Sequence, residues 1–204
     1  CNPQAAGGFT AAGFYFARRI HKDMNVPVGL LDDNWGGTKI EPWIPRCGFD
    51  LVPDLSKLLS DLEKRSDEYR KNLAGSIDSL EKWIPAARKA LTDNSDIPSL
   101  PGVPNNPLIE SHNPMAICHA MIFPVVPYGL KGALWYQGES NGGEGDEYYA
   151  KMQALIGGWR KLWGQGDLPF YFVQLANWQQ PGKEPAGGDG WARVRMAQTR
   201  SMGI

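Results

Sequence analysis

This sequence has few cysteines, no long hydrophobic run and no excess of positive charge. Cys1, Cys47 and Cys118 show no C-x-x-C spacing, which excludes the common zinc and redox motifs and allows one disulfide at most. No apolar run approaches the ~20 residues that a membrane span needs, and no signal peptide is visible at the N-terminus. We therefore expect no membrane as a partner, and because the formal net charge is -1, we expect no nucleic acid either.

The 204 residues are enough for one α/β domain with its own core. Hydrophobic residues make up 42% and charged residues 21%, as is usual in globular proteins. Aromatic residues, at 11%, are on the high side. Carbohydrate-active proteins use such rings to bind sugars, but burial in a core is the more frequent reason for a tryptophan. The sequence does not indicate an oligomeric state.

Helical spacing of apolar residues recurs along the chain. In the helix predicted over residues 144–163, one face carries Tyr148, Met152, Leu155 and Trp159. The predicted helices cover residues 9–22 with Thr10 as N-cap, residues 144–163, and residues 189–200 with Asp189 as N-cap.

Short apolar runs between these helices predict strands at residues 26–31, 132–137 and 170–175. Strands that alternate with helices indicate an α/β fold with a parallel sheet. A short helix or turn is expected over residues 115–123.

Residues 51–114 differ in character from the rest of the chain. Leucines and isoleucines recur every three to four residues up to about Thr92, with charged residues between them, and a Pro/Asn/Ser-rich loop follows. The pattern predicts a pair of amphipathic helices broken near Gly75. We interpret residues 51–114 as a helical insertion on the main sheet.

Two polar segments follow predicted strands. Residues 35–38, the W-G-G-T segment, come after the first strand, and residues 137–141, the Q-G-E-S-N segment, end the second. Open α/β sheets place their chemistry at the carboxyl ends of parallel strands. Both segments are therefore expected at one edge of the sheet.

The Q-G-E-S-N segment allows two interpretations. Gly138 to Gly142 fits the G-x-S-x-G pattern of a nucleophile elbow, with Ser140 as the nucleophile. In α/β-hydrolases, however, the histidine follows the serine, and here no histidine follows His119. Within this chain, the usual order along the sequence, in which the catalytic histidine follows the elbow serine, is therefore absent.

The second interpretation assigns the two segments to an oxyanion hole. An oxyanion is stabilised by backbone N–H groups in a glycine turn and by neutral amides. Gly36 and Gly37 supply the first kind of donor, and Gln137 supplies the second. Taken separately, the glycines could form a plain turn and Gln137 could cap a loop. Together, at one edge of the sheet, they indicate function.

Other reactive combinations are weaker. Cys118 and His119 are immediate neighbours, whose side chains point in different directions on a helix or strand. Asp32 and Asp33 precede a glycine turn, where a turn-forming and solvated role is expected.

Several segments resemble the sialate O-acetylesterases, carbohydrate esterases among the SGNH (GDSL-like) hydrolases. The similarity covers most of the chain outside residues 51–114, and its most specific part is the pair W-G-G-T and W-Y-Q-G-E-S-N. The matching segments are residues 9–16, 26–30, 34–38, 41–43, 135–141 and 195–198.

The resemblance implies a flavodoxin-like three-layer α/β/α sandwich with a parallel sheet and no metal or organic cofactor. It implies that Gly37 (or Gly36) and Gln137 form the oxyanion hole. Glu139 is expected to orient the site. Substrate contacts are expected from the residues Trp35, Thr38, Asn141 and Arg195.

The family also uses a nucleophile serine in a G-x-S motif near the start of the domain and a D-x-x-H acid–base block near its end. This sequence contains no G-D-S or G-Q-S, and no D-x-x-H follows the third predicted strand. Either the chain is the central part of a longer domain, or this relative has lost its triad. The first is favoured, because the two losses coincide with the two limits of the chain. We therefore expect residues 1–204 to form part of an SGNH domain whose nucleophile and acid–base blocks lie outside it.

The expected function is hydrolysis of acetyl esters on sugars, such as sialic acid or a plant glycan, through an acyl-serine intermediate. An acetylated carbohydrate is the expected partner, and secretion or a periplasmic location is the expected localisation. The alternatives are a non-catalytic carbohydrate-binding relative and an α/β-hydrolase that uses Ser140.

Overall fold

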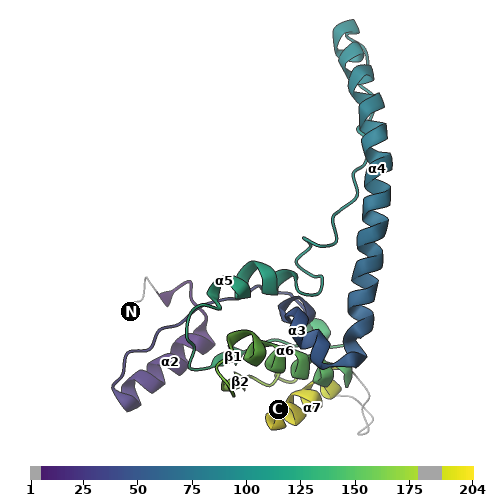
Figure 1. The fold of residues 1–204 in the computed structure, drawn as a ribbon. Helices are drawn as coiled ribbons and strands as arrows, with labels where there is room; N and C mark the ends of the chain where they lie inside the picture. The colour runs from purple at the N-terminus through teal and green to yellow at the C-terminus, as the bar shows by residue number, and fades with distance from the viewer. Residues whose placement is uncertain (1–5, 179–189) are drawn as a thin grey trace.

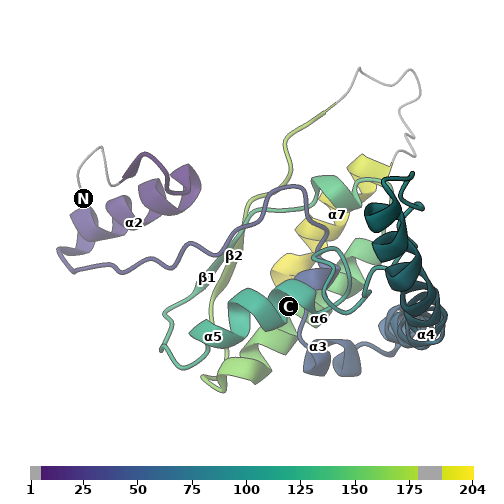
Figure 2. The same cartoon turned by 90° about the horizontal axis from the view of Figure 1, so that it is seen from above.

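The computed structural model describes residues 6–178 and 190–204. Figure 1 shows a long helix, α4 (Ser56–Asp93), that extends away from a body built around a small sheet. Helix α2 (Ala11–Met24) lies to one side of this body, as Figure 2 shows from above. The chain between α2 and the body carries the W-G-G-T segment.

The sheet consists of β1 (Ala133–Trp135) and β2 (Phe170–Phe172), which run parallel. Their register pairs Leu134 with Tyr171. Trp135 is buried against the core, whereas Leu134 and Tyr171 are exposed on the other face. The predicted α/β class with a parallel sheet is thus confirmed, although both strands are shorter than expected.

The core lies between the sheet and helix α6 (Glu147–Trp163), which α3 (Arg46–Leu51) and α7 (Gly190–Arg200) flank. The predicted inward face of α6 is confirmed, since all four of its expected residues are buried. Helix α7 begins where predicted, and Asp189 lies outside the described residues. Short helical segments complete the chain: η1 (Glu41–Trp43), η2 (Pro53–Leu55), the π-helical η3 (Cys118–Ile122), α5 (Phe123–Val125), η4 (Glu139–Asn141) and η5 (Ser201–Gly203).

The predicted strand at residues 26–31 is wrong, because this segment has no regular secondary structure. Val26, Val28 and Leu31 are all exposed. No described strand pairs with the segment, and a strand needs a neighbour to satisfy its backbone N–H and C=O groups. Apolar composition alone therefore misidentified it.

The predicted break near Gly75 is also wrong, because α4 is one continuous helix of 38 residues. Gly75 faces open space, and Pro85 also lies inside the helix. The helix ends at Asn94, whose left-handed conformation directs its N–H to the Ala90 and Leu91 carbonyls. Leu59 and Leu62 anchor the first turns in the core.

Thr10 occupies the predicted N-cap position of α2, but its side chain makes no capping hydrogen bond. Instead, its backbone N–H donates to Asp32 Oδ2 at 3.1 Å. Asp32 also accepts a hydrogen bond from Asn34 Nδ2 at 2.7 Å, which agrees with its expected turn-forming role.

Cys47 and Cys118 are free thiols, and Cys1 lies outside the described residues. Burial raises the pKa of the Cys118 thiol to about 12, so this side chain is not a thiolate at neutral pH. His119 is exposed, and its ring packs against Phe123. The described part of the chain has no helix that is both long enough and apolar enough to cross a membrane.

Candidate functional site

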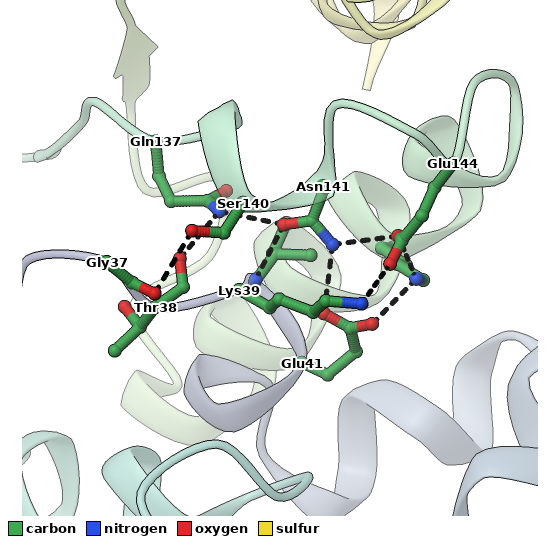
Figure 3. A network of polar contacts seen from close by, with 10 residues as sticks. Gly37, Thr38, Lys39, Glu41, Gln137, Ser140, Asn141 and Glu144 are labelled. Carbon is green, nitrogen blue, oxygen red and sulfur yellow. Dashed lines mark hydrogen bonds and ion pairs between the residues drawn. The ribbon is translucent and has the colours of Figure 1, made fainter. Parts of the chain in front are cut away.

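The W-G-G-T and Q-G-E-S-N segments lie side by side (Figure 3). Gln137 Nε2 donates to the Thr38 carbonyl at 2.9 Å across 99 positions of sequence. Ser140 Oγ donates to the Gly37 carbonyl at 3.0 Å across 103 positions. Two long-range hydrogen bonds therefore join the segments, even though the first does not follow a regular strand.

The glycine turn of the W-G-G-T segment is exposed, with Gly37 in the left-handed region at φ +77°. No described residue accepts a hydrogen bond from the Gly37 N–H. Thr38 is buried, and its hydroxyl donates to the Trp35 carbonyl at 2.8 Å and accepts from Trp43 Nε1 at 3.0 Å. The turn thus presents an open N–H donor on a rigid base.

Gln137 follows β1 and is almost completely buried. Its Nε2 also donates to Asn141 Oδ1 at 2.7 Å, so both amide hydrogens have acceptors. Its Oε1 accepts from the Tyr148 hydroxyl at 2.9 Å. Burial raises the pKa of Tyr148, which keeps this hydroxyl protonated. The Gln137 side chain is held in one orientation by α6 and by the W-G-G-T segment.

Asn141 is fully buried at the centre of the contacts in Figure 3. Its Oδ1 accepts from the Ile40 N–H at 3.0 Å and from Gln137. Its Nδ2 donates to Glu41 Oε2 at 3.1 Å and to Glu144 Oε2 at 2.7 Å. All four hydrogen-bonding positions of the amide are occupied.

Two lysines and two glutamates surround Asn141. Lys151 Nζ contacts Glu41 Oε1 at 2.7 Å and also Glu144 Oε2, and its side chain is 4% exposed. Lys39 Nζ contacts Glu144 Oε1 at 2.8 Å. We call five of these residues the buried polar network: Glu41, Gln137, Asn141, Glu144 and Lys151. The exposed Lys39 pairs with this network through Glu144.

Burial acts to raise the pKa of Glu144, but hydrogen bonds from Lys151, Lys39 and Asn141 outweigh it. The net pKa of this carboxyl is below its ordinary value of 4.5. Glu144 is therefore ionised at neutral pH, where it stabilises both lysines. The network holds the two polar segments against the N-terminal half of α6.

The sequence-based site did not include Lys39, Glu41, Glu144 or Lys151. One signal was available, because Lys151 falls between Tyr148 and Met152 on the apolar face of its helix. A lysine at such a position is rarely buried without a partner. The identity of that partner depends on which loop covers the helix, which the spacing does not show.

Ser140 is not arranged as an elbow nucleophile. It lies in the single turn η4, and its hydroxyl donates to the Gly37 carbonyl. In the described part of the chain, no histidine is hydrogen-bonded to Ser140. The elbow interpretation therefore has no geometric support. Glu139 is exposed beside it.

The remaining predicted residues lie in different surroundings. Trp35 is 53% exposed beside the glycine turn. Arg195 lies on α7, where its carbonyl accepts from Gln174 Nε2 at 3.0 Å. Its Nε is buried and has no acceptor among the described residues. No described hydrogen bond joins Arg195 to the two polar segments.

A cleft of about 490 Å³ opens beside the two segments. Its lining includes Gly37 and Ser140 of the two segments, Asp61 and Arg65 of α4, and His112. Within residues 6–178 and 190–204, no group of three or more His, Cys, Asp or Glu residues could hold a metal ion.

Comparisons with known proteins show which proteins this chain is similar to. Residues 119–203 match the model of a family described as carbohydrate esterase, sialic acid-specific acetylesterase. The chain is 30% identical to a sialate O-acetylesterase of Rattus norvegicus, over 97% of this chain and 35% of that protein. It is 24% identical to the sialate O-acetylesterase of Homo sapiens, over 95% of this chain and 30% of that protein.

A crystal structure of a carbohydrate acetylesterase from Xanthomonas citri is also similar, with a TM-score of 0.59 at 26% identity. The match covers 100% of this chain and 34% of that one. The chain spans about a third of the length of the curated relatives it matches. In sequence and in fold, the chain is similar to part of the sialate O-acetylesterases, which are carbohydrate esterases.

Proposed function

We propose that the full-length polypeptide containing this chain is a carbohydrate O-acetylesterase, which removes acetyl groups from sugar hydroxyls. The observation that carries the proposal is the pair of hydrogen bonds between the W-G-G-T and Q-G-E-S-N segments. They bring an open backbone N–H and a buried amide to one place, as an oxyanion hole requires. The names of the related proteins support acetyl esters as the substrate.

In the proposed reaction, a serine hydroxyl attacks the acetyl carbonyl carbon and passes its proton to a histidine. The C–O bond to the sugar then breaks, and the histidine returns the proton to the departing sugar oxygen. Water hydrolyses the acetyl-serine to acetate by the same steps. We propose that segments outside the described residues supply the serine, the histidine and the aspartate. This mechanism requires no metal or organic cofactor.

The Gly37 N–H, with Gly36 shaping the turn, is the first proposed donor to the oxyanion. Gln137 is the second. Because both of its amide hydrogens now have acceptors, it would exchange the Thr38 carbonyl for the oxyanion when the ester binds. The bond to Asn141 would keep the amide oriented during this exchange.

The other predicted residues receive supporting roles in the proposal. Glu139 orients the loop that carries Gln137. The exposed Trp35 ring offers a face on which a sugar can stack. Thr38 and Asn141 hold the two segments in place, and Arg195, on α7, is proposed to contact the sugar.

We further propose that the two-stranded sheet is part of a flavodoxin-like three-layer sandwich, in which residues 51–114 form an insertion. Residues 1–204 would then make up part of one SGNH domain. An acetylated glycan as substrate fits a secreted or periplasmic protein.

The test is to express the full-length polypeptide and measure acetate release from an aryl acetate and from acetylated sugars. A fluorophosphonate that labels active serines, followed by peptide mapping, identifies the nucleophile. Acetate release together with a label on a serine other than Ser140 is the expected outcome. A label on Ser140 would establish the elbow mechanism instead. Sugar binding with neither label nor acetate release would identify a non-catalytic binding protein.

A further inference from the structure

The cleft beside the two polar segments is also lined by residues that the proposed oxyanion hole does not include. Arg65 and Asp61 project from the first turns of α4, four positions apart, so they share one face of the helix. The volume of about 490 Å³ falls within the usual range of roughly 300–1,000 Å³ for small-molecule sites.

Arg65, one of the residues that line the cleft, is held in place by a hydrogen bond. Its Nη2 donates to Asn113 Oδ1 at 2.7 Å. Asn113 is itself buried and is fixed by bonds from its Nδ2 to the Pro107 carbonyl at 2.6 Å and to Glu110 Oε2 at 3.0 Å. The guanidinium is thus oriented by a rigid amide, which lowers the entropy that a ligand must remove on binding.

Most of the donors of Arg65 remain available. A guanidinium has five N–H groups, and Asn113 accepts from Nη2. Among the described residues, no carboxylate lies within ion-pair distance of Arg65. By contrast, Lys39, which also lines the cleft, is already paired with Glu144.

Asp61 supplies the complementary acceptor. Its carboxylate is about half exposed, and its ion pair with Lys64 is long, at 3.7 Å. A donor and an acceptor side by side match the hydroxyls of a sugar ring, because each hydroxyl both donates and accepts. Leu58 adds apolar surface to the same cleft for the C–H groups of the ring.

We propose that Arg65 and Asp61 form a subsite that binds the hydroxyls of the sugar carrying the acetyl ester. This inference rests on the proposed esterase function, which places the acetyl carbonyl at Gly37. Arg65 donates to the ring hydroxyls and Asp61 accepts from them. The subsite makes the enzyme prefer an acetylated sugar to an acetyl ester of a simple alcohol.

The experiment compares kcat/KM of the full-length protein for an aryl acetate, a monoacetylated neutral hexose and a monoacetylated hexuronic acid. Arg65→Ala and Asp61→Asn are the test variants, and Arg70→Ala, an exposed arginine of the same helix, is the control. We expect each test variant to lower kcat/KM for both sugars at least about tenfold more than for the aryl acetate, as loss of a hydrogen bond to a charged group predicts. The control should leave all three values unchanged.

Equal losses on all three substrates, or no loss, would overturn the subsite. A loss confined to the hexuronic acid would also overturn it, because Arg65 would then bind a carboxylate and not hydroxyls.

Calorimetric titration with the unacetylated hexose measures binding at the subsite independently of ester hydrolysis. An inactive wild type whose hexose binding weakens in Arg65→Ala would refute the esterase function and retain the subsite. An inactive wild type that binds no hexose would refute both.

Discussion

Gln137 and Asn141 are two buried amides, four positions apart, that are hydrogen-bonded to each other. Asn141 has all four hydrogen-bonding positions occupied by buried protein groups. Gln137 has the same degree of occupancy on its nitrogen, but one acceptor is the carbonyl of Thr38, a buried residue next to the exposed glycine turn. In the proposed function, Gln137 is the amide that exchanges this acceptor for the oxyanion.

We predict that Gln137→Ala in the full-length protein lowers kcat about 100-fold or more, because removing one oxyanion donor has effects of this size. The rate of acetate release measures it. Gln174→Ala is the control, since it removes a more exposed amide that bonds to Arg195 and Thr199. A fall of less than about fivefold for Gln137→Ala would rule out the oxyanion assignment.

We predict that Asn141→Asp destabilises the protein more than Asn141→Ala. The aspartate would replace the Nδ2 donor with an oxygen that faces the carboxylates of Glu41 and Glu144. A buried charge without a partner costs about 3–5 kcal/mol, which corresponds to a fall in Tm of about 10 °C for a chain of this length.

Thermal unfolding of both Asn141 variants measures this difference. Asn72→Asp makes the same change at an exposed position of α4 and should leave Tm almost unaltered. If Asn141→Asp were as stable as Asn141→Ala, the carboxylates would not face this amide in solution.

At the scale of elements, helix α6 determines where the polar segments lie. Its inward face buries Tyr148 and Lys151 toward the segments and Met152 toward the core. Because Lys151 reaches both Glu41 and Glu144, one helix fixes η1 and the loop before α6 together. The site therefore depends on the packing of α6.

We predict that the buried polar network makes the protein sensitive to acid. The folded pKa of Glu144 is lowered, so its contribution to stability is fully present above the ordinary pKa of 4.5 and is lost as pH falls through the folded pKa. The difference in free energy of unfolding between wild type and Glu144→Gln should be largest near pH 7 and should shrink below about pH 4.5.

Denaturant titrations between pH 7 and 3 measure this difference. The variant Glu63→Gln, at an exposed carboxylate of α4, is the control. A difference that does not change with pH would show that Glu144 is not stabilised in its charged form.

We predict opposite effects for two glycine substitutions in helices. Gly75→Ala should stabilise the protein by about 0.5–1 kcal/mol, since α4 is continuous there and an added Cβ meets nothing within 4 Å. Gly48→Ala should destabilise it, because the Cβ would lie 2.2 Å from the Ala154 carbonyl oxygen of α6. Circular dichroism melts compare them. A destabilising Gly75→Ala would indicate that α4 bends in solution.

At the scale of the whole molecule, the chain exposes much more surface than its size requires. A folded protein of 22.5 kDa exposes about 9,500 Å², whereas this chain exposes 13446 Å². Part of the excess comes from α4, whose 38 residues span about 57 Å. Another part comes from the outer face of the sheet, where Leu134, Tyr171 and Val173 are exposed.

We predict that the 204 residues expressed alone have low stability. A parallel sheet of two three-residue strands is smaller than the three strands usually needed for independent stability, and its edges are open. A broad thermal transition and binding of a hydrophobic dye are the expected results. A monomer that melts sharply and binds no dye would contradict this prediction.

Local sequence patterns were sufficient to predict the α/β class, the inward face of α6 and the two polar segments. These depend on local periodicity and on short motifs, which a sequence shows directly. The predictions of a strand at residues 26–31 and of a helix break at Gly75 were wrong. A short apolar run or a single glycine does not define the local structure without the residues that pack against it. Tertiary structure alone decided the hydrogen bonds between the segments, the charged partners of Lys151 and the position of Arg65 beside the cleft. These contacts join residues far apart in sequence, so only the folded chain brings them within hydrogen-bond distance.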